Sequence, residues 1–354
     1  MTFDEARGMF PVLERLAYLN AGTFGPLSRA TVAAMAELHD DELVAGRSSR
    51  AYFERGQELR AELRRRFAEL VSVPAESVAL TASTTDGCHV VLAGLGLGPD
   101  DEVITTTDEH FGLLGPLHAS SARIVVVEPS AEAILGAITA RTKLLAVSHV
   151  LWTTGRILPV HELRERSGLP ILVDAAQAVG AIPVDAHGLD FLAIPGQKWL
   201  CGPDPTGALV VADPEALRVA RPGSFSQAGY EPDGTFVPRA GAARFDTNWI
   251  THAALAGLEI ALSQVPEWRF ERAAVQADRL RALLGGRVEV MTAPEQATLV
   301  AFRPPAGRTA AELVARLVDD GVVVREIPGR ELVRASVGWW TSDGDLERLV
   351  AGLG

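Results

Sequence analysis

The chain has 354 residues, of which 47% are hydrophobic, and a formal net charge of -12 at pH 7. This length accommodates one large domain and a smaller one, and the apolar content is that of a globular protein. The negative charge and the lack of any Lys/Arg block exclude nucleic acid or an anionic membrane as the main partner, because both require concentrated positive charge.

Targeting and metal-binding signals are missing from the sequence. The first residues, MTFDEARGMF, contain no basic region followed by an apolar segment, and no run of about 18 apolar residues occurs anywhere. We therefore expect a soluble, cytoplasmic protein. The two cysteines, Cys88 and Cys201, form no disulfide framework, and the eight histidines show no metal spacing, so no metal site is expected.

Helical patterns come first in the chain, and short apolar runs follow. The two helical patterns cover residues 27–45 and 52–71, the second with leucine and phenylalanine at a spacing of three to four. The apolar runs are rich in β-branched residues and lie at 77–81, 102–106, 122–127, 143–148, 170–174, 190–195 and 207–213. Because these runs are continuously apolar rather than alternating, they predict strands covered on both faces, as in a mostly parallel sheet of an α/β fold.

The C-terminal part has a different layout. After a loop-rich section at 220–248 and a helical pattern at 251–262, the sequence predicts further helices and strands. The helices are expected over 269–284, 309–320 and 345–353, and the strands over 288–292, 297–304, 322–327 and 332–338. We expect a large domain at 20–250 and a small α+β domain formed by 1–19 and 251–354.

Polar side chains stand where several predicted strands end, which is where ligands bind to open parallel sheets. Ser83, Thr84 and Thr85 follow the first strand and open a helical pattern, where hydroxyls and free N–H groups suit a phosphate. Later strands end at His110, at His149, at Asp174 with Gln177 one turn on, and at Lys198. Singly, a threonine pair is more often a helix cap and a lysine is more often solvated. On successive strand ends, they indicate one site.

One cofactor uses this whole set. Pyridoxal phosphate (PLP) needs a lysine for covalent attachment, an acid that keeps its pyridine nitrogen protonated, and an anion cradle for its phosphate. Lys198, Asp174 and the hydroxyls of residues 83–85 match these needs, and His110 is the candidate to stack on the ring. Burial beside apolar neighbours such as Trp199 would disfavour the ammonium form of the lysine and keep its amine reactive.

These residues resemble the class V aminotransferase family of PLP-dependent enzymes, which includes cysteine desulfurases, isopenicillin N epimerase-like proteins and carbon–sulfur lyases. The resemblance runs from YLNAGTFGP to VRASVGWWTSDGDLERLV. Its most specific part is the ordered series TASTTDG, DEHFG, SHVLWTTGRILPV, VDAAQAVG, GQKWLCGP and RFDTN. It implies the α/β fold of fold-type I PLP enzymes: a large domain with a mostly parallel seven-stranded sheet and a smaller C-terminal α+β domain.

The resemblance also implies roles for individual residues. Lys198 would form the Schiff base with PLP, Asp174 would pair with the pyridine nitrogen and His110 would stack on the ring. Further cofactor contacts would come from Ser83, Thr84, Thr85, His149, Gln177, Gln197 and Thr247. The last of these would be donated by the second subunit of a homodimer with shared active sites. Substrate contacts would come from Arg334, which would hold the α-carboxylate, and from Asn20, Ala21 and Gly22.

Departures from the family pattern bear on the reaction. Gln197 stands where many members have a histidine before the lysine, and Ser148-His149 stands where desulfurases carry Ser-Asn. Sulfur-transferring desulfurases need a nucleophilic cysteine shortly before the carboxylate-binding arginine, and residues 265–333 contain no cysteine. Cys201, three residues past the lysine, is more often a packing residue than a nucleophile.

We therefore expect an enzyme that acts on an amino acid through an external aldimine and an α-carbanion. Elimination at a carbon–sulfur bond without a persulfide cysteine is favoured, and transamination or epimerisation is the alternative. A nucleotide-binding oxidoreductase is disfavoured because GLGLGPD at 94–100 lacks GxGxxG spacing and follows a helical pattern. The intact Lys198, Asp174 and Arg334 disfavour a non-catalytic binding protein.

Overall fold

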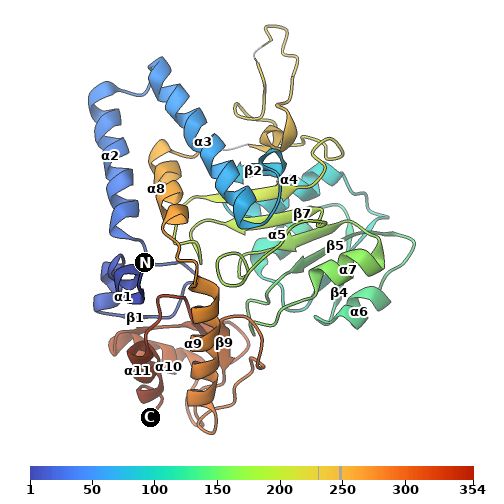
Figure 1. The fold of residues 1–354 in the computed structure, drawn as a ribbon. Helices are drawn as coiled ribbons and strands as arrows, with labels where there is room; N and C mark the ends of the chain where they lie inside the picture. Colours follow the sequence, from blue (N-terminus) through green and yellow to red (C-terminus); the bar gives the residue numbers. More distant parts are fainter. Residues whose placement is uncertain (230, 247–248) are drawn as a thin grey trace.

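A seven-stranded sheet forms the largest layer of the fold. The computed structural model describes residues 1–229, 231–246 and 249–354 (Figure 1). The strand order is β2-β8-β7-β6-β5-β3-β4, and β8 alone runs antiparallel to its neighbours. The strands are β2 (Val78–Thr81), β3 (Glu102–Thr106), β4 (Arg123–Val127), β5 (Thr142–Ser148), β6 (Ile171–Asp174), β7 (Phe191–Pro195) and β8 (Gly207–Val211). The predicted strands and the mostly parallel sheet are confirmed.

Two hydrophobic cores cover the two faces of this sheet. Alternate residues of one strand go to different cores: Leu172 packs with α4 (Thr84–Leu95) and α5 (Phe111–Ala119), whereas Val173 packs with the opposite group of helices. That group includes α3 (Arg50–Leu70), α6 (Ala131–Gly136) and α7 (Val160–Ser167). Burial on both faces explains why the strands read as continuous apolar runs.

Two long helices near the N-terminus pack against α8, and the second of them also reaches the sheet (Figure 1). They are α2 (Arg29–Ala45), which packs along α8 (His252–Ser263), and α3, which packs on both α8 and β2. Ser28 and Ser49 cap the N-termini of α2 and α3, each accepting a backbone N–H in the first turn. Short helices precede and connect these elements: α1 (Phe3–Gly8), η1 (Pro11–Glu14), η2 (Ala75–Ser77) and η3 (Gly241–Phe245).

The C-terminal part forms a separate core around a three-stranded antiparallel sheet, β11-β12-β9. Its elements are α9 (Arg269–Leu284), β9 (Leu299–Phe302), α10 (Ala310–Asp319), β10 (Val322–Val323), β11 (Arg325–Ile327), β12 (Leu332–Ser336) and α11 (Asp343–Ala351). The N-terminal segment joins it, because β1 (Ala17–Tyr18) pairs with β10 and Arg7 forms an ion pair with Asp345 at 2.7 Å. The predicted division into domains 20–250 and 1–19 plus 251–354 stays a prediction.

Two predicted C-terminal strands differ in the structure. Residues 288–292 form no continuous strand: Val290 makes an isolated antiparallel bridge to Phe302 of β9, and the backbone pairing stops where Ala301 N donates to the side chain of Thr292. Residues 322–327 divide into β10 and β11, which belong to different sheets. Among the described residues, no helix is long and apolar enough to cross a membrane.

Candidate active site

A cavity of about 230 Å³ lies beyond the carboxyl ends of the parallel strands, where the C-terminal part meets the large sheet. It is lined by Gly22, Thr23, Phe24, Ser83, Thr84, Thr85, His110, Gly112, Trp152, Asp174, Ala176, Gln197, Lys198, Arg325 and Arg334. Nine predicted site residues therefore meet at one place. His149, Gln177, Asn20 and Ala21 do not line the cavity, and Thr247 lies outside the described residues.

The turn after β7 delivers Lys198 to the cavity. At Gly196 a side chain is excluded, because a Cβ there would come within 2.2 Å of Thr206 Oγ1. Enclosure by the protein lowers the pKa of the Lys198 amine to about 8, with Asp174 opposing this shift. A substantial fraction of the amine is therefore neutral near physiological pH, as a nucleophile or proton acceptor requires.

Asp174 ends β6 and is the carboxylate among the residues that line the cavity. The side chain is 3% exposed, and its Oδ1 accepts a hydrogen bond from Ala176 N at 2.8 Å. Burial raises the pKa of this carboxyl group, while Lys198 lowers it. A facing cation stabilises a buried carboxylate of this kind, and the pyridinium nitrogen of PLP would supply one.

The N-terminus of α4 also lines the cavity. Ser83 caps the helix by accepting from Asp86 N at 3.1 Å. Thr84 Oγ1 is buried and has no hydrogen-bond partner among the described residues, as is also true of Gln197 Oε1. A buried hydroxyl without a partner beside a helix N-terminus fits the phosphate of PLP, which accepts hydrogen bonds there.

Two arginines face each other across strands β11 and β12. Arg325 lies directly opposite Arg334 in the register, and both line the cavity. Arg334 Nη1 donates to Trp152 O at 2.9 Å and Arg325 Nη1 donates to Thr23 Oγ1 at 3.4 Å. Neither guanidinium forms an ion pair within the part of the chain that the structure describes. Burial lowers the pKa of Arg334, and the positive charge of Arg325 lowers it further. A bound anion would therefore offset both the burial of this charge and the repulsion between the two guanidinium groups.

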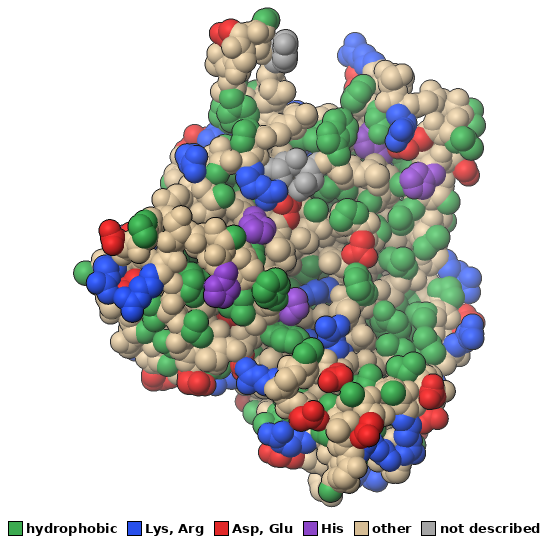
Figure 2. Space-filling view, turned by 180° about the vertical axis from the view of Figure 1, so that it is seen from behind, with side chains coloured by type: hydrophobic (Ala, Val, Ile, Leu, Met, Phe, Trp, Pro, Cys, Tyr) green, Lys and Arg blue, Asp and Glu red, His purple; other side chains and the backbone are tan. Residues whose placement is uncertain are grey.

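The charge of the cavity therefore favours anionic ligands. Three cationic side chains, Lys198, Arg325 and Arg334, share it with the single lining carboxylate of Asp174. Figure 2 shows the face turned away from the viewer in Figure 1, where histidine and basic side chains gather near the middle. A phosphate together with one or two carboxylates would balance the cavity's charge.

His110 occupies a wall of the cavity as the N-cap of α5. Its Nδ1 accepts from Gly112 N at 3.0 Å, and its ring meets Trp152 edge-on with 5.0 Å between centroids. Burial, followed by the positive charge of Lys198 and of the two arginines, lowers the pKa of His110 to about 4. The ring is therefore neutral at pH 7 and carries its proton on Nε2, a state suited to stacking on a cofactor ring.

Two of the predicted cofactor-binding residues, Gln177 and His149, lie outside the lining of the cavity. Gln177 Nε2 donates to Gly22 O at 2.9 Å, and its Oε1 accepts from Trp199 Nε1 at 3.0 Å, so it ties the N-terminal loop to the segment after the lysine. Burial lowers the pKa of His149 to about 4, and its Nδ1 has no partner among the described residues.

The N-terminal loop itself is built to pass close to the arginines. Asn20 Oδ1 accepts from Thr23 Oγ1 at 2.8 Å, and Ala21 is fully buried. A Cβ at Gly22 would lie 2.8 Å from Arg334 Nη2. Only glycine leaves room for the guanidinium beside this loop.

Sequence reasoning missed Glu109, which anchors the turn that carries His110. The carboxylate is buried and accepts from Thr106 Oγ1 at 2.7 Å and from the backbone N–H and hydroxyl of Ser148. Burial raises the pKa of Glu109 to about 7, although these hydrogen bonds oppose the shift. The sequence feature that could have indicated Glu109 is its position directly before His110 in DEHFG.

The raised pKa of Glu109 predicts a pH-dependent stability. Between pH 4.5 and about 7 the unfolded chain loses this proton while the folded chain keeps it. The contribution of Glu109 to the free energy of unfolding of the cofactor-free protein therefore falls over this window, by on the order of 3 kcal/mol. Glu109→Gln should raise the melting temperature by a few degrees at pH 8.5 and change it little at pH 4.5. An equal shift of melting temperature at both pH values would contradict this interpretation.

Both thiols are sequestered. Cys88 is fully buried within α4, and Cys201 is 5% exposed with a left-handed backbone φ of 56°. Burial raises the pKa of each thiol, so neither is a thiolate at neutral pH.

A lysine with a depressed pKa, a buried carboxylate and an anion cradle at the carboxyl edge of a mostly parallel sheet define a PLP-dependent enzyme. The sequence profile of the class-V aminotransferases matches residues 18–347, and the chain belongs to this family. The predicted family, fold and cofactor are thereby confirmed.

Relatives in this family include enzymes of different reaction types. The chain is 28% identical to isopenicillin N epimerase of Streptomyces clavuligerus, covering 99% of this chain and 97% of that one. It is also 28% identical to cysteine desulfurase of Klebsiella pneumoniae strain 342, covering 100% and 98%. The cystine C–S lyase C-DES, solved with its reaction product cysteine persulfide, superposes with a TM-score of 0.91 at 26% identity, covering 97% and 98%. A C-DES variant with glycine covalently linked to its PLP cofactor gives a TM-score of 0.92.

Proposed function

We propose that this enzyme is a carbon–sulfur lyase that cleaves a cysteine-derived disulfide carrying a carboxylate at each end. The observation that carries the proposal is the pair Arg325 and Arg334, opposite each other in the same cavity as Lys198. Arg334 takes the α-carboxylate next to the reacting carbon, and Arg325 takes the distal carboxylate. The similarity to C-DES, named as a cystine C–S lyase, supports this substrate class.

The reaction follows from the groups that surround the substrate. PLP, when bound, supplies an electron sink that stabilises negative charge next to the substrate's α-carbon. Lys198 Nζ takes the α-proton, since its lowered pKa leaves it able to accept one. The bond between the β-carbon and sulfur then breaks, and the sulfur leaves with the bonding electron pair. Asp174 keeps the negative charge that holds the cofactor's ring nitrogen protonated.

Sulfur is expected to leave with the product rather than on the protein. The cysteines Cys88 and Cys201 are both buried, and residues 265–333 contain none. The enzyme therefore has no cysteine on an exposed loop that could carry a persulfide. For a disulfide substrate, the leaving group itself is a persulfide, and no protein thiol is required.

The proposal includes a homodimer in which Thr247 of one subunit completes the phosphate site of the other. Two large apolar side chains near the relevant segments support such a contact: Phe111, next to His110, is 74% exposed, and Trp249, two residues past Thr247, is 65% exposed. Aromatic side chains are enriched in protein–protein interfaces relative to the rest of the surface. Thr84 and Thr85 hold the phosphate from within the same subunit.

A matched pair of substrates tests the reaction and the role of Arg325 together. L-cystine and S-(methylthio)-L-cysteine both contain the disulfide, but only cystine has the distal carboxylate. The wild type should form pyruvate and a persulfide from cystine. In Arg325→Gln, kcat/KM for cystine should fall by about 10- to 100-fold, the loss expected for one charged hydrogen-bonded pair. The same variant should turn over S-(methylthio)-L-cysteine nearly as well as the wild type.

Other outcomes of this assay point to other reactions. Keto-acid formation with conversion of the cofactor to its pyridoxamine form, without pyruvate, would establish an aminotransferase. Inversion at the α-carbon without elimination would establish an epimerase. An equal loss on both substrates in Arg325→Gln would overturn the assignment of the second arginine.

A further inference from the structure

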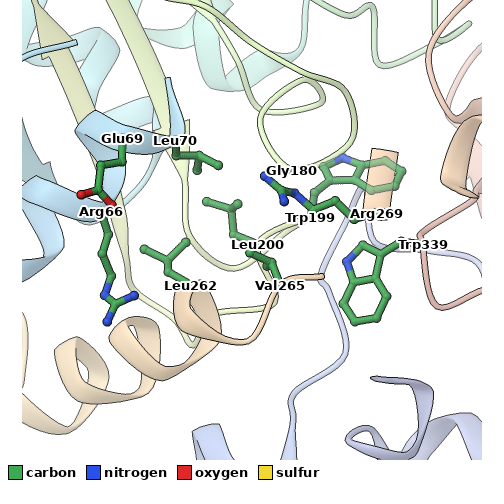
Figure 3. A pocket seen from close by; sticks show the side chains of 10 residues that line it. All are labelled: Arg66, Glu69, Leu70, Gly180, Trp199, Leu200, Leu262, Val265, Arg269 and Trp339. Carbon is green, nitrogen blue, oxygen red and sulfur yellow. The ribbon is translucent and has the colours of Figure 1, made fainter. Parts of the chain in front are cut away.

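A second pocket of about 220 Å³, nearly the size of the active-site cavity, lies beside the segment that follows Lys198. Figure 3 shows the indole rings of Trp199 and Trp339 on one side of this pocket and the charged side chains of Arg66 and Glu69 on the other. We call it the Trp199 pocket. It is lined by Arg66, Glu69, Leu70, Gly180, Trp199, Leu200, Leu262, Val265, Arg269 and Trp339.

The Trp199 pocket has rigid apolar walls. Trp339 is fixed by edge-on packing on Trp268 at 5.9 Å and on Trp340 at 5.3 Å between ring centroids. At Gly180, with φ of 90°, a Cβ would come within 2.9 Å of the backbone carbon and the Cβ of Trp199, so these two segments of the chain pass in direct contact. These surfaces suit the flat or branched body of a small apolar ligand.

The charged side chains that line the pocket differ in their ion pairing. Arg66 pairs with Glu62 at 2.8 Å and with Glu259 at 2.6 Å. Glu69 pairs with Arg65. Arg269, in contrast, forms no ion pair among the described residues.

The guanidinium of Arg269 is held at the start of α9. It stands over the Phe270 ring at 4.2 Å and donates to Pro266 O at 3.2 Å. Burial lowers the pKa of Arg269, and no side chain caps the N-terminus of α9. Figure 3 shows the side chain of Arg269 reaching from α9 toward the middle of the pocket. The guanidinium and the uncapped helix end together favour an anionic group.

We propose that the Trp199 pocket is an accessory site for a small carboxylic acid with an aromatic or branched apolar body, whose carboxylate pairs with Arg269. This inference is independent of the reaction proposed above. Two hydrogen bonds link the site to the active-site cavity: Trp199 donates to Gln177, which donates to Gly22 O. A ligand against Trp199 therefore touches the residue next to Lys198, and its binding is reported by indole fluorescence.

Fluorescence titration of the PLP-loaded enzyme tests this site with 3-phenylpropionate as the probe and 3-phenylpropanol as its neutral analogue. The carboxylate should quench the indole fluorescence saturably below about 10 mM, and the alcohol should bind about 10-fold or more weakly. Arg269→Gln should weaken carboxylate binding by a similar factor. Arg287→Gln, an exposed arginine just past the same helix, is the matched control and should leave binding unchanged.

The two active-site arginines must be excluded as the binder. Arg325→Gln and Arg334→Gln should each keep the quench, and its loss in either variant would place the probe in the active site and overturn the proposal. The absence of saturable quenching in the wild type, or unchanged affinity in Arg269→Gln, would also overturn it. If Arg269→Gln does not fold, as judged by its melting curve and cofactor absorbance, Val265→Trp fills the pocket instead and should abolish binding. Retained binding in that variant would contradict the proposed site.

Discussion

Lys198→Ala is expected to lower turnover by about 10⁴-fold or more, because it removes both the covalent attachment of the cofactor and the group that takes the substrate's α-proton. The fold should tolerate the change, since the buried amine has a depressed pKa and forms no ion pair among the described residues. The measurement is pyruvate formation from cystine by enzyme reconstituted with PLP, with the melting temperature recorded in parallel.

The sequence offers a matched control for this variant. Its only other lysine, Lys143, is exposed on β5 at the end of the strand far from the cavity. Lys143→Ala should retain near wild-type turnover. Comparable activity in Lys198→Ala, or a comparable loss in both variants, would contradict the role assigned to Lys198.

Asp174→Asn is expected to lower kcat by about 10²-fold or more, since an amide cannot supply the negative charge that keeps the cofactor's ring nitrogen protonated. Burial already raises the pKa of Asp174, so the neutral amide should not destabilise the cofactor-free protein. Activity should fall without a fall in melting temperature, a combination that a purely structural role would not give.

Asp213→Asn is the matched control for Asp174→Asn. Asp213 follows β8, whose antiparallel direction places it at the opposite edge of the same sheet. Its Oδ1 accepts from Glu215 N and Ala216 N, a capping role that asparagine also fills. This variant should be fully active. A kcat for Asp174→Asn close to that of the control would show that the buried charge does not act on the cofactor.

Most of the residues that line the cavity could be predicted from the sequence, because they directly follow the predicted strands. Apolar runs located the strands, and polar residues directly after them, such as Thr84, Asp174 and Lys198, had to meet at one edge because parallel strands share their carboxyl ends. The length of each run and its β-branched content sufficed for this step, and no knowledge of side-chain contacts was needed.

Arg325 could not be found in the same way. Its segment reads as one strand over 322–327, but the structure divides it between two sheets. Its place in the cavity depends on the register that sets it opposite Arg334, and register is determined by pairing across the sheet rather than by the local sequence. The same limit explains residues 288–292, where the pairing with β9 is cut short because the Thr292 side chain accepts from Ala301 N.

Residues behind the cavity wall were also beyond sequence reasoning. Gln177 follows a strand end and was expected to reach the cofactor, yet its amide binds Gly22 and Trp199, which are distant in sequence. Glu109 differs from an ordinary solvated glutamate only through its burial against Ser148 on a neighbouring strand. Both depend on tertiary contacts that no local pattern encodes.

The central claim is that Lys198 carries the cofactor, and borohydride reduction of the PLP-loaded enzyme followed by peptide mass mapping tests it most directly. With two lysines in the chain, the assignment is unambiguous. The phosphopyridoxyl group should be fixed on the peptide that contains Lys198, and the Lys143 peptide should be unmodified. Modification of Lys143, or no modified lysine in an enzyme that shows PLP absorbance, would contradict the account.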